Sequence, residues 1–370
     1  MNRTSHLVRS TNASEMLTTE CMVTKYNAQE TWAWNLKNGP RNSAGPSSET
    51  PVAGSWAWCG IPIGSPLGIS AGPLLNSQWL LHYANLGFDV LVYKTVRSCS
   101  RDCYPLPNLI PVHSDPLSAA GSIVSETEQM DGTWAVSFGM PSQPPDIWRA
   151  DVEVARQRLP AGKVLVVSVV GTQDESISGS QQALQQLAAD FAQCARWAVE
   201  SGAHGIEANF SCPNVATPDG QLYQQADAAA VVAERIRSEI GNTPLVLKIG
   251  RISSEKQAAD LIAAVGPWIH GLAMTNSIAA RVKRTDGSLA FGGESRGICG
   301  AATLAASTAQ LKMFRQALER ENTALDLVGV GGIADVTHVR DYLKAGADSV
   351  AMATAAMTDP EIGRKIRRAL

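Results

Sequence analysis

The sequence predicts an α/β protein built as a closed (β/α)8 barrel, the TIM barrel, with an N-terminal extension and a long insertion after the second strand. Eight short, nearly continuous apolar runs recur after residue 60 of the 370-residue chain, and stretches with helical periodicity separate them. Apolar strands that alternate with helices are typical of parallel sheets covered on both faces. An open doubly wound sheet is the main alternative, but it rarely uses eight consecutive βα units.

The predicted strands share near-continuous apolar character, and each is short enough to be a buried strand. They are 66–71, 88–94, 164–170, 204–210, 244–250, 268–276, 326–332 and 348–354. Between them, 179–203 shows apolar residues at helical spacing and ends at Gly202, as expected of a helix followed by a glycine cap. The segments 222–241, 302–320 and 336–346 have a similar pattern.

The chain outside the repeats divides into two further parts. Residues 1–55 are rich in Ser, Thr, Asn, Gly and Pro and form an extension or arm before the barrel of 56–370. The WAW patches at 32–34 and 56–58 are expected to pack this arm or a hairpin against the body. Residues 98–161 lack periodicity, and an insertion that leaves the end of a barrel strand is expected to lie over the active site like a lid.

The composition excludes several classes of protein. With 34 acidic and 31 basic residues, the chain has no basic excess to attract nucleic acid or an anionic membrane. No apolar run approaches the roughly 20 residues of a membrane span, and the N-terminus lacks the apolar block of a secretory signal. The seven cysteines show no zinc, iron–sulfur or disulfide spacing. We therefore expect a soluble, cytoplasmic protein that binds small molecules and carries no metal.

Polar residues gather where the predicted strands end. Lys94 ends the second run and Lys248 lies inside the very apolar fifth run, where an unpaired ammonium would be expensive. Each lysine is therefore expected to meet a ligand of anionic character; a lysine that reaches the surface is the alternative. Asn209–Asn214, Asn276 and Ser277 follow the fourth and sixth runs, so one rim of the barrel becomes the predicted active site.

The last two strand ends indicate a phosphate site. Glycines in 329–333 allow a close backbone approach to an anion, and 350–360 leads from a strand into a final helix whose first amides can bind phosphate. A tight turn explains many Gly-Gly pairs and stays open as an alternative. Two such loops in the last two units favour a phosphate-bearing ligand.

These residues resemble the dihydroorotate dehydrogenase family of FMN-dependent barrels, which is related to the flavin domain of dihydropyrimidine dehydrogenase. The resemblance runs from about Gly60 to the C-terminus. Its most specific segment is 207-EANFSCPNV-215, which is similar to the family's ELNLSCPN. The others are 92-VYKT-95, 246-VLKIG-250, 275-TNS-277 and the GVGGI and AMATA pair.

The resemblance implies a role for each matching residue. Cys212 would be the general base for a substrate that gives hydride to FMN. Lys248 would stabilise negative charge on the reduced flavin, and Lys94 would contact the flavin or the substrate. Substrate contacts would come from Asn209, Asn214, Asn276, Ser277, Gly139 and Met140. FMN contacts would come from Ala71, Gly72, Lys94, Thr95, Lys248, Gly297, Gly300, Gly331, Gly332, Ala353 and Thr354.

A cysteine base resembles the soluble branch of the family, which implies a homodimer and a second electron acceptor of the fumarate kind or a cluster-bearing partner. Two positions depart from the pattern. Val136 stands where soluble members have an asparagine that meets the substrate, which would remove a hydrogen bond at about 1–3 kcal/mol. Ala353 replaces a glycine beside the phosphate threonine. The substrate is therefore dihydroorotate, a different cyclic amide or a specialised metabolite; a flavin-free barrel that binds a phosphorylated metabolite is the further alternative.

Overall fold

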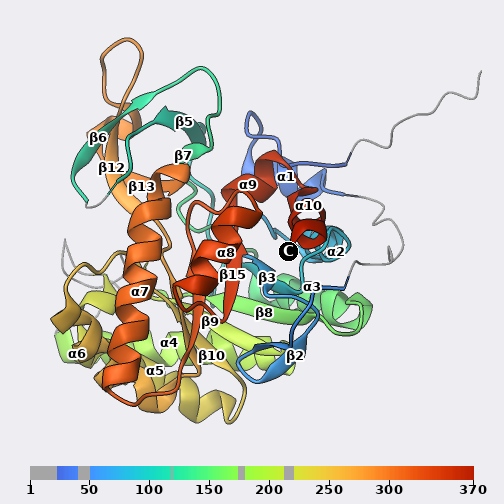
Figure 1. Cartoon of the computed structure of the whole chain (residues 1–370), viewed down its shortest axis with the longest axis vertical. Coiled ribbons are helices and arrows are strands. Elements are labelled where there is room, and N and C mark those ends of the chain that lie inside the picture. The colour runs from blue at the N-terminus through green and yellow to red at the C-terminus, as the bar shows by residue number, and fades with distance from the viewer. Residues whose placement is uncertain (1–22, 41–50, 118–119, 174–179, 212–220) are drawn as a thin grey trace, which may run out of the picture.

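The computed structural model describes residues 23–40, 51–117, 120–173, 180–211 and 221–370 (Figure 1). Eight parallel strands close into a barrel, which confirms the predicted TIM barrel. Each predicted run contains one of these strands, whose side chains are almost all buried. In barrel order they are β3 (Leu67–Ile69), β4 (Val90–Val96), β8 (Val164–Val169), β9 (Gly205–Asn209), β10 (Leu245–Lys248), β11 (Gly271–Met274), β14 (Asp326–Val330) and β15 (Ser349–Met352).

Helices lie outside the strands and cover the barrel (Figure 1). Their starts are set locally: Asn76 caps one helix through Trp79 N, and Asp335 caps another through His338 N. The four predicted helices correspond to α4, α5, α7 and α8. The helices are α1 (Trp32–Lys37), α2 (Ser77–Ala84), α3 (Pro145–Arg158), α4 (Ser180–Glu200), α5 (Ala226–Ile240), α6 (Glu255–Val265), α7 (Leu304–Arg320), α8 (Val336–Lys344), α9 (Thr354–Thr358) and α10 (Ile362–Ala369).

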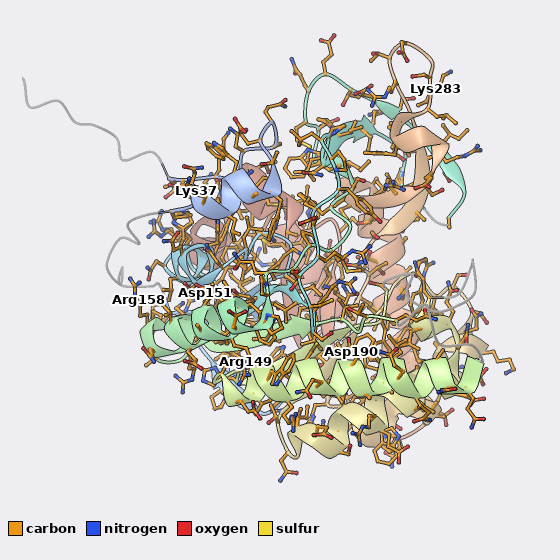
Figure 2. The ribbon with its side chains drawn as sticks, turned by 180° about the vertical axis from the view of Figure 1, so that it is seen from behind. Lys37, Arg149, Asp151, Arg158, Asp190 and Lys283 are labelled. Atoms are coloured by element: carbon orange, nitrogen blue, oxygen red, sulfur yellow. The ribbon has the colours of Figure 1, made fainter. Side chains whose placement is uncertain are left out.

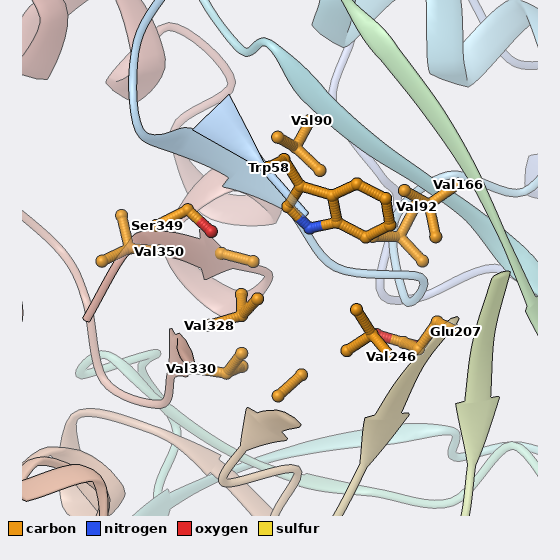
Figure 3. Close-up of a pocket in the computed structure, with 12 residues that line it drawn as sticks. Trp58, Val90, Val92, Val166, Glu207, Val246, Val328, Val330, Ser349 and Val350 are labelled. Atoms are coloured by element: carbon orange, nitrogen blue, oxygen red, sulfur yellow. The ribbon is translucent and has the colours of Figure 1, made fainter. Parts of the chain in front are cut away.

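A tryptophan closes the N-terminal end of the barrel. Trp58 lies on β1 (Trp56–Trp58), which pairs antiparallel with β2 (Ile61–Ile63), and its ring packs among valines from the barrel strands (Figure 3). A Cβ added at Gly205 would lie 2.5 Å from this ring, so the start of β9 touches it. The cavity left inside is about 10 Å³, room for no more than a water molecule. This end of the barrel therefore has no room for a ligand.

A second, smaller barrel stands on the first. It joins β5 (Leu109–His113), β6 (Ser122–Glu126) and β7 (Thr133–Val136) to β12 (Ile278–Lys283) and β13 (Arg296–Gly300). It has its own apolar core, and Figure 2 shows Lys283 at its outer part, away from α4. Two chain segments build it, one after β4 and one after β11.

The segment 98–161 was expected to be a single insertion without periodicity, and the structure divides it. Its first part supplies β5, β6 and β7 to the small barrel, whereas Pro145–Arg158 is helix α3, which packs on the main barrel beside α2 and α4. No local pattern indicates that 278–300 completes the small barrel. The domain division itself stays a prediction.

The described part of the N-terminal arm packs against α2. Trp79 Nε1 donates to Asn35 O at 3.1 Å, and His82 Nε2 lies 2.9 Å from Thr24 O. Tyr26 reaches further, and its ring meets that of Phe138 edge to face at 6.2 Å. Tyr26 thus lies next to the segment that leads from the small barrel to α3. Within the described ranges, no helix has the length and apolarity needed to span a membrane.

Candidate active site

The carboxyl ends of the eight strands meet at one end of the barrel, and the predicted site residues follow them. The parallel register places Lys248 opposite Asn209 on one side and opposite Ala273 on the other. Strands β3, β4, β11, β14 and β15 bring further predicted groups to the same rim, while Gly139, Met140, Gly297 and Gly300 come from the small barrel and the loop after it. Cys212 and Asn214 lie outside the described residues, so their roles stay predictions.

Lys248 has a partner within the protein. Its Nζ donates to Glu207 Oε1 at 2.7 Å, and both side chains are almost fully buried. The sequence predicts an anionic ligand for this lysine, whereas the structure supplies a counter-charge from within the protein, Glu207 on β9. Glu207 also lines the cavity above Trp58 (Figure 3). The ammonium is thereby held in one place at the end of β10, whatever else it meets.

Asn209 presents its amide toward the small barrel. Its Oδ1 accepts hydrogen bonds from Ser211 Oγ at 2.7 Å and Ser211 N at 3.2 Å, which leaves Nδ2 as the outward donor. Nδ2 lies 3.5 Å from Met140 Sδ, and a thioether is a weak acceptor. The structure therefore brings together two predicted substrate contacts from distant segments. The amide donor can exchange this contact for a ligand oxygen.

Lys94 and Thr95 end β4 on another side of the rim. Lys94 N donates to Leu74 O at 2.9 Å, and Thr95 Oγ1 lies 2.9 Å from Ser168 Oγ. The pKa of the Cys103 thiol is raised to about 11 by burial, although the positive charge of Lys94 opposes this shift. Lys94 therefore lies near a thiol that the sequence analysis did not single out.

The end of β11 joins the site to the small barrel. Asn276 N donates to Ile249 O at 3.1 Å, and Asn276 O accepts from Cys299 Sγ at 3.7 Å. A Cβ at Gly297 would lie 2.6 Å from Ser277 Oγ, so β13 passes close to this serine. Burial raises the pKa of Cys299 to about 12, and Lys248 opposes this, which places the thiol near the lysine.

Thr275 is a further polar group at this point. Its side chain is buried, and Thr275 Oγ1 has no hydrogen-bond partner among the residues that the structure describes. A buried hydroxyl without a partner is unfavourable by about 1–3 kcal/mol. It therefore fits a site in which a polar ligand group supplies the missing bond.

The glycine loop after β14 has a backbone conformation that only glycine adopts readily. Gly331 and Gly332 have φ values of 123° and 73°. A Cβ at Gly332 would lie 2.5 Å from Leu304 Cβ, so close packing on α7 also requires glycine. Among the residues that the structure describes, by contrast, only Ala353 Cβ lies within 4 Å of a Cβ added at Gly72, at 3.9 Å. The ends of β3 and β15 thus border open space next to Thr354.

Arg97 ties the loops around the site together, and sequence reasoning missed it. It is 2% exposed, and its guanidinium donates to Met140 O at 3.3 Å and Gly171 O at 3.2 Å. It also donates to Thr172 Oγ1 at 3.1 Å. The sign in the sequence that could have indicated Arg97 was its charge, directly after the apolar segment that forms β4. Its carbonyl-directed contacts fix the loop that carries Gly139 and Met140.

Fold and site define an enzyme class: a TIM-barrel enzyme whose buried lysine, amides and glycine loop converge at the carboxyl ends of the strands. Within the described residues, no cluster of three or more His, Cys, Asp or Glu side chains could hold a metal ion. A family model described as dihydroorotate dehydrogenase matches residues 56–370. The chain belongs to the dihydroorotate dehydrogenase family and is an oxidoreductase.

Named relatives agree with this assignment. The chain is 31% identical to a dihydroorotate dehydrogenase of Dictyostelium discoideum over 367 residues, which covers 92% of this chain and 95% of the relative. It is 25% identical to a dihydroorotate dehydrogenase (quinone) of Legionella pneumophila, with 78% and 79% covered. The crystal structure of the Eimeria tenella enzyme in complex with ferulenol has a TM-score of 0.64 at 17% identity, with 85% and 82% covered, and shows the likeness of fold.

Proposed function

We propose that this protein oxidises dihydroorotate, or a dihydropyrimidine close to it, to the unsaturated ring with FMN as cofactor. The observation that carries the proposal is the buried Lys248, held by Glu207 beside Asn209 at the carboxyl ends of the strands. A fixed cation in this position suits a reaction that places negative charge on a bound ring. The family of the chain and its named relatives support the substrate.

The residues present fit FMN. Thr275 Oγ1 offers a buried hydroxyl that needs a partner, and Lys248 offers a cation for the flavin ring. The loops at Gly331–Gly332 and Ala353–Thr354 would hold the phosphate, and the open space beside Gly72 leaves room for the group between them. FMN, when bound, supplies the acceptor for a hydride. Ala71, Thr95, Gly297 and Gly300 complete the proposed contacts.

The chain's own groups would orient the substrate. Asn209 Nδ2, whose contact with Met140 Sδ is weak, would donate to a ring carbonyl, and Asn276 with Ser277 would contact another edge. The backbone of Gly139 and Met140 would meet the substrate from the side of the small barrel. Because Arg97 holds Met140 O, this backbone is fixed before substrate arrives. Asn214 belongs to the proposed set through its motif.

Cys212 is the proposed general base. It follows Ser211, whose hydroxyl and amide are both fixed by Asn209 Oδ1, so the start of its loop is anchored beside the substrate. The thiolate form would take a proton from the carbon next to the one that loses hydride. A free thiol has a pKa of about 8.5, so only a few per cent is thiolate near pH 7. The rate should therefore rise with pH toward that value.

The remaining proposals concern the setting of the reaction. We infer a second electron acceptor that is a small molecule of the fumarate kind, a homodimer and a cytoplasmic location. The absence of a basic excess in the composition supports small-molecule partners over nucleic acid.

Anaerobic addition of dihydroorotate to the purified protein tests the function. The flavin absorbance should bleach, and Cys212→Ala should keep bound flavin but reduce bleaching at least a hundredfold in rate. Cys99→Ala, which alters an exposed thiol, should behave as the unaltered protein. Unchanged bleaching in Cys212→Ala would refute the role of that thiol, and a colourless protein that binds no added FMN would refute the cofactor.

A second candidate keeps the fold and the flavin but acts on another cyclic amide. Val136 favours it, because this side chain lies opposite Gly297 in the β7–β13 pairing and offers no hydrogen bond to a substrate. A set of cyclic amides tested for flavin bleaching separates the two candidates. Bleaching by an amide other than dihydroorotate, with dihydroorotate inert, would establish the second.

A further inference from the structure

The backbone of residues 138–140, the proposed substrate loop, has a conformation that its sequence does not favour. Gly139 and Met140 have φ values of 71° and 51°, both in the left-handed region. Glycine adopts this region freely, but methionine does so rarely, and such a backbone persists only where its surroundings hold it. The groups that pack on the substrate loop therefore decide whether it keeps its place at the rim.

Two residues of the segment after β4 hold one side of the substrate loop. Arg97 Nε donates to Met140 O at 3.3 Å. Tyr104 N donates to Phe138 O at 3.1 Å, and a Cβ added at Gly139 would lie 2.7 Å from the Tyr104 ring. Both residues follow β4 closely in the sequence, so this side of the loop is fixed by the barrel itself.

The N-terminal arm supplies a further contact from far away in the sequence. The Tyr26 ring meets the Phe138 ring edge to face, with ring centres 6.2 Å apart and planes at 88°. Such a pair is favourable beyond the area that it buries. Tyr26 is 4% exposed, and its ring also lies 6.3 Å from the ring of Trp79 on α2. Tyr26 thus connects α2 with the first residue of the substrate loop.

The ring of Tyr26 makes these contacts, and its hydroxyl adds nothing to them. Tyr26 Oη has no hydrogen-bond partner among the residues that the structure describes. The nearby Asn35 amide donates instead to Asn27 O at 2.9 Å and to Thr31 O at 3.0 Å. Burial raises the pKa of the Tyr26 phenol, and the Cys103 thiol adds to this effect. The hydroxyl therefore stays neutral, and its removal breaks no hydrogen bond.

The arm is anchored to α2 on both sides of Tyr26. His82 Nε2 lies 2.9 Å from Thr24 O, and Asn76 Nδ2 donates to Leu36 O at 3.2 Å. Because these two contacts flank Tyr26 in the sequence, the arm cannot slide along α2 without breaking one of them. The position of the Tyr26 ring is therefore set by α2 and not by the loop that it touches.

We propose that Tyr26 is a positioning residue, which holds the substrate loop at the rim through Phe138. The N-terminal arm thereby becomes part of the support of the active site. The inference rests on the proposed function, in which Gly139 and Met140 contact the substrate. Since Tyr26 acts on the loop, it governs binding of the substrate, whereas the flavin contacts and the chemical step do not depend on it.

Steady-state kinetics of three variants test the proposal. Tyr26→Ala should raise KM for dihydroorotate about twofold to tenfold, the factor that corresponds to one aromatic pair, with kcat changed less than about twofold and bound FMN unchanged. Tyr26→Phe keeps the ring and should behave as the unaltered protein. Trp34→Ala removes a 40% exposed ring from the same arm and should also change nothing. An unchanged KM in Tyr26→Ala, or an equal rise in Tyr26→Phe, would overturn the role of the ring.

Two further measurements separate this role from general damage. Phe138→Ala should also raise KM, and Tyr26→Ala added to it should cause no further rise, whereas additive effects would show that Tyr26 does not act through Phe138. Without substrate, the backbone amides of 137–142 should exchange hydrogen faster in Tyr26→Ala than in Tyr26→Phe, and equal exchange would overturn the proposal. If the unaltered protein does not bleach with dihydroorotate, the proposed function fails, and the exchange experiment alone then decides whether Tyr26 holds the loop.

Discussion

Lys248 Nζ lies 2.7 Å from Glu207 Oε1 in a part of the barrel where both side chains are about 5% exposed. The parallel register explains the pair: Lys248 stands opposite Asn209, and Glu207 precedes Asn209 by two residues on the same face of β9. Glu207 thus occupies the interior layer below the rim and Asn209 the layer above. The carboxylate fixes the lysine for any ring that binds at the rim.

Glu207→Gln should destabilise the protein, because it leaves the Lys248 ammonium buried without a counter-charge. Breaking a buried ion pair from one side costs about 3–5 kcal/mol, and the free energy of unfolding from urea titration measures it. The double variant Glu207→Gln with Lys248→Met should recover much of this stability, because no buried charge remains. It should still bind FMN more weakly than the unaltered protein, because the Lys248 cation is absent. If Glu207→Gln alone were as stable as the unaltered protein, the ion pair would not be needed to keep Lys248 buried.

Arg97→Lys should loosen the loop that holds Gly139 and Met140. Lysine keeps the charge but cannot reach Met140 O, Gly171 O and Thr172 Oγ1 together, as the guanidinium does. We expect a loss of about 1–3 kcal/mol in the free energy of unfolding and a several-fold rise in KM for the substrate. Arg158→Lys, at the exposed end of α3 (Figure 2), is the matched control and should change neither quantity.

The strands of the main barrel were predictable because they are buried on both faces. A strand such as β8, with every side chain buried, has a continuous apolar sequence that marks it locally. The small barrel was not predicted, because its strands are not buried on both faces. Its strand β12 alternates buried with exposed residues, and its parallel partner β6 lies far away in sequence, at Ser122–Glu126. Local patterns carry no information about such a pairing.

The site residues, too, could be predicted only where a local sequence pattern marks them. Lys248 and Asn209 were found because polar groups at the ends of apolar strands are conspicuous, and the structure places them on neighbouring strands. Glu207 and Arg97 were missed because their importance comes from partners on other segments. A carboxylate two residues before Asn209 looks ordinary until the register brings Lys248 next to it.

Asp89 holds the C-terminal helix to the base of the barrel. Its carboxylate meets Arg367 Nη1 at 2.7 Å and Lys163 Nζ at 2.9 Å, and all three side chains are buried. Asp89→Asn should therefore cost about 3–5 kcal/mol of unfolding free energy, because it removes the carboxylate that two buried cations share. The exposed pair of Asp359 and Lys365 is the comparison. Asp359→Asn should cost less than about 1 kcal/mol, and equal losses for the two variants would contradict this account.

Two histidines cap strand starts and should make stability depend on pH. His204 Nδ1 accepts from Leu165 N at 3.0 Å, and His270 Nδ1 accepts from Leu245 N at 3.2 Å, so each ring must keep an unprotonated nitrogen. Burial lowers the pKa of both, and Arg156 and Arg237 respectively add to this effect. Since an unfolded histidine has a pKa of about 6.5, the unfolded chain takes up protons that the folded protein refuses below that pH.

The melting temperature should therefore be constant above about pH 6.5 and fall as the pH is lowered from there toward the folded pKa values. His204→Asn with His270→Asn should weaken this dependence, because the amide oxygen can accept the same backbone bonds and does not titrate. The part that remains comes from His82, whose pKa burial also lowers. His113→Asn, on an exposed histidine of β5, should leave the dependence unchanged. Parallel melting curves for the unaltered protein and the double variant from about pH 8 to pH 5 would show that other groups control acid stability.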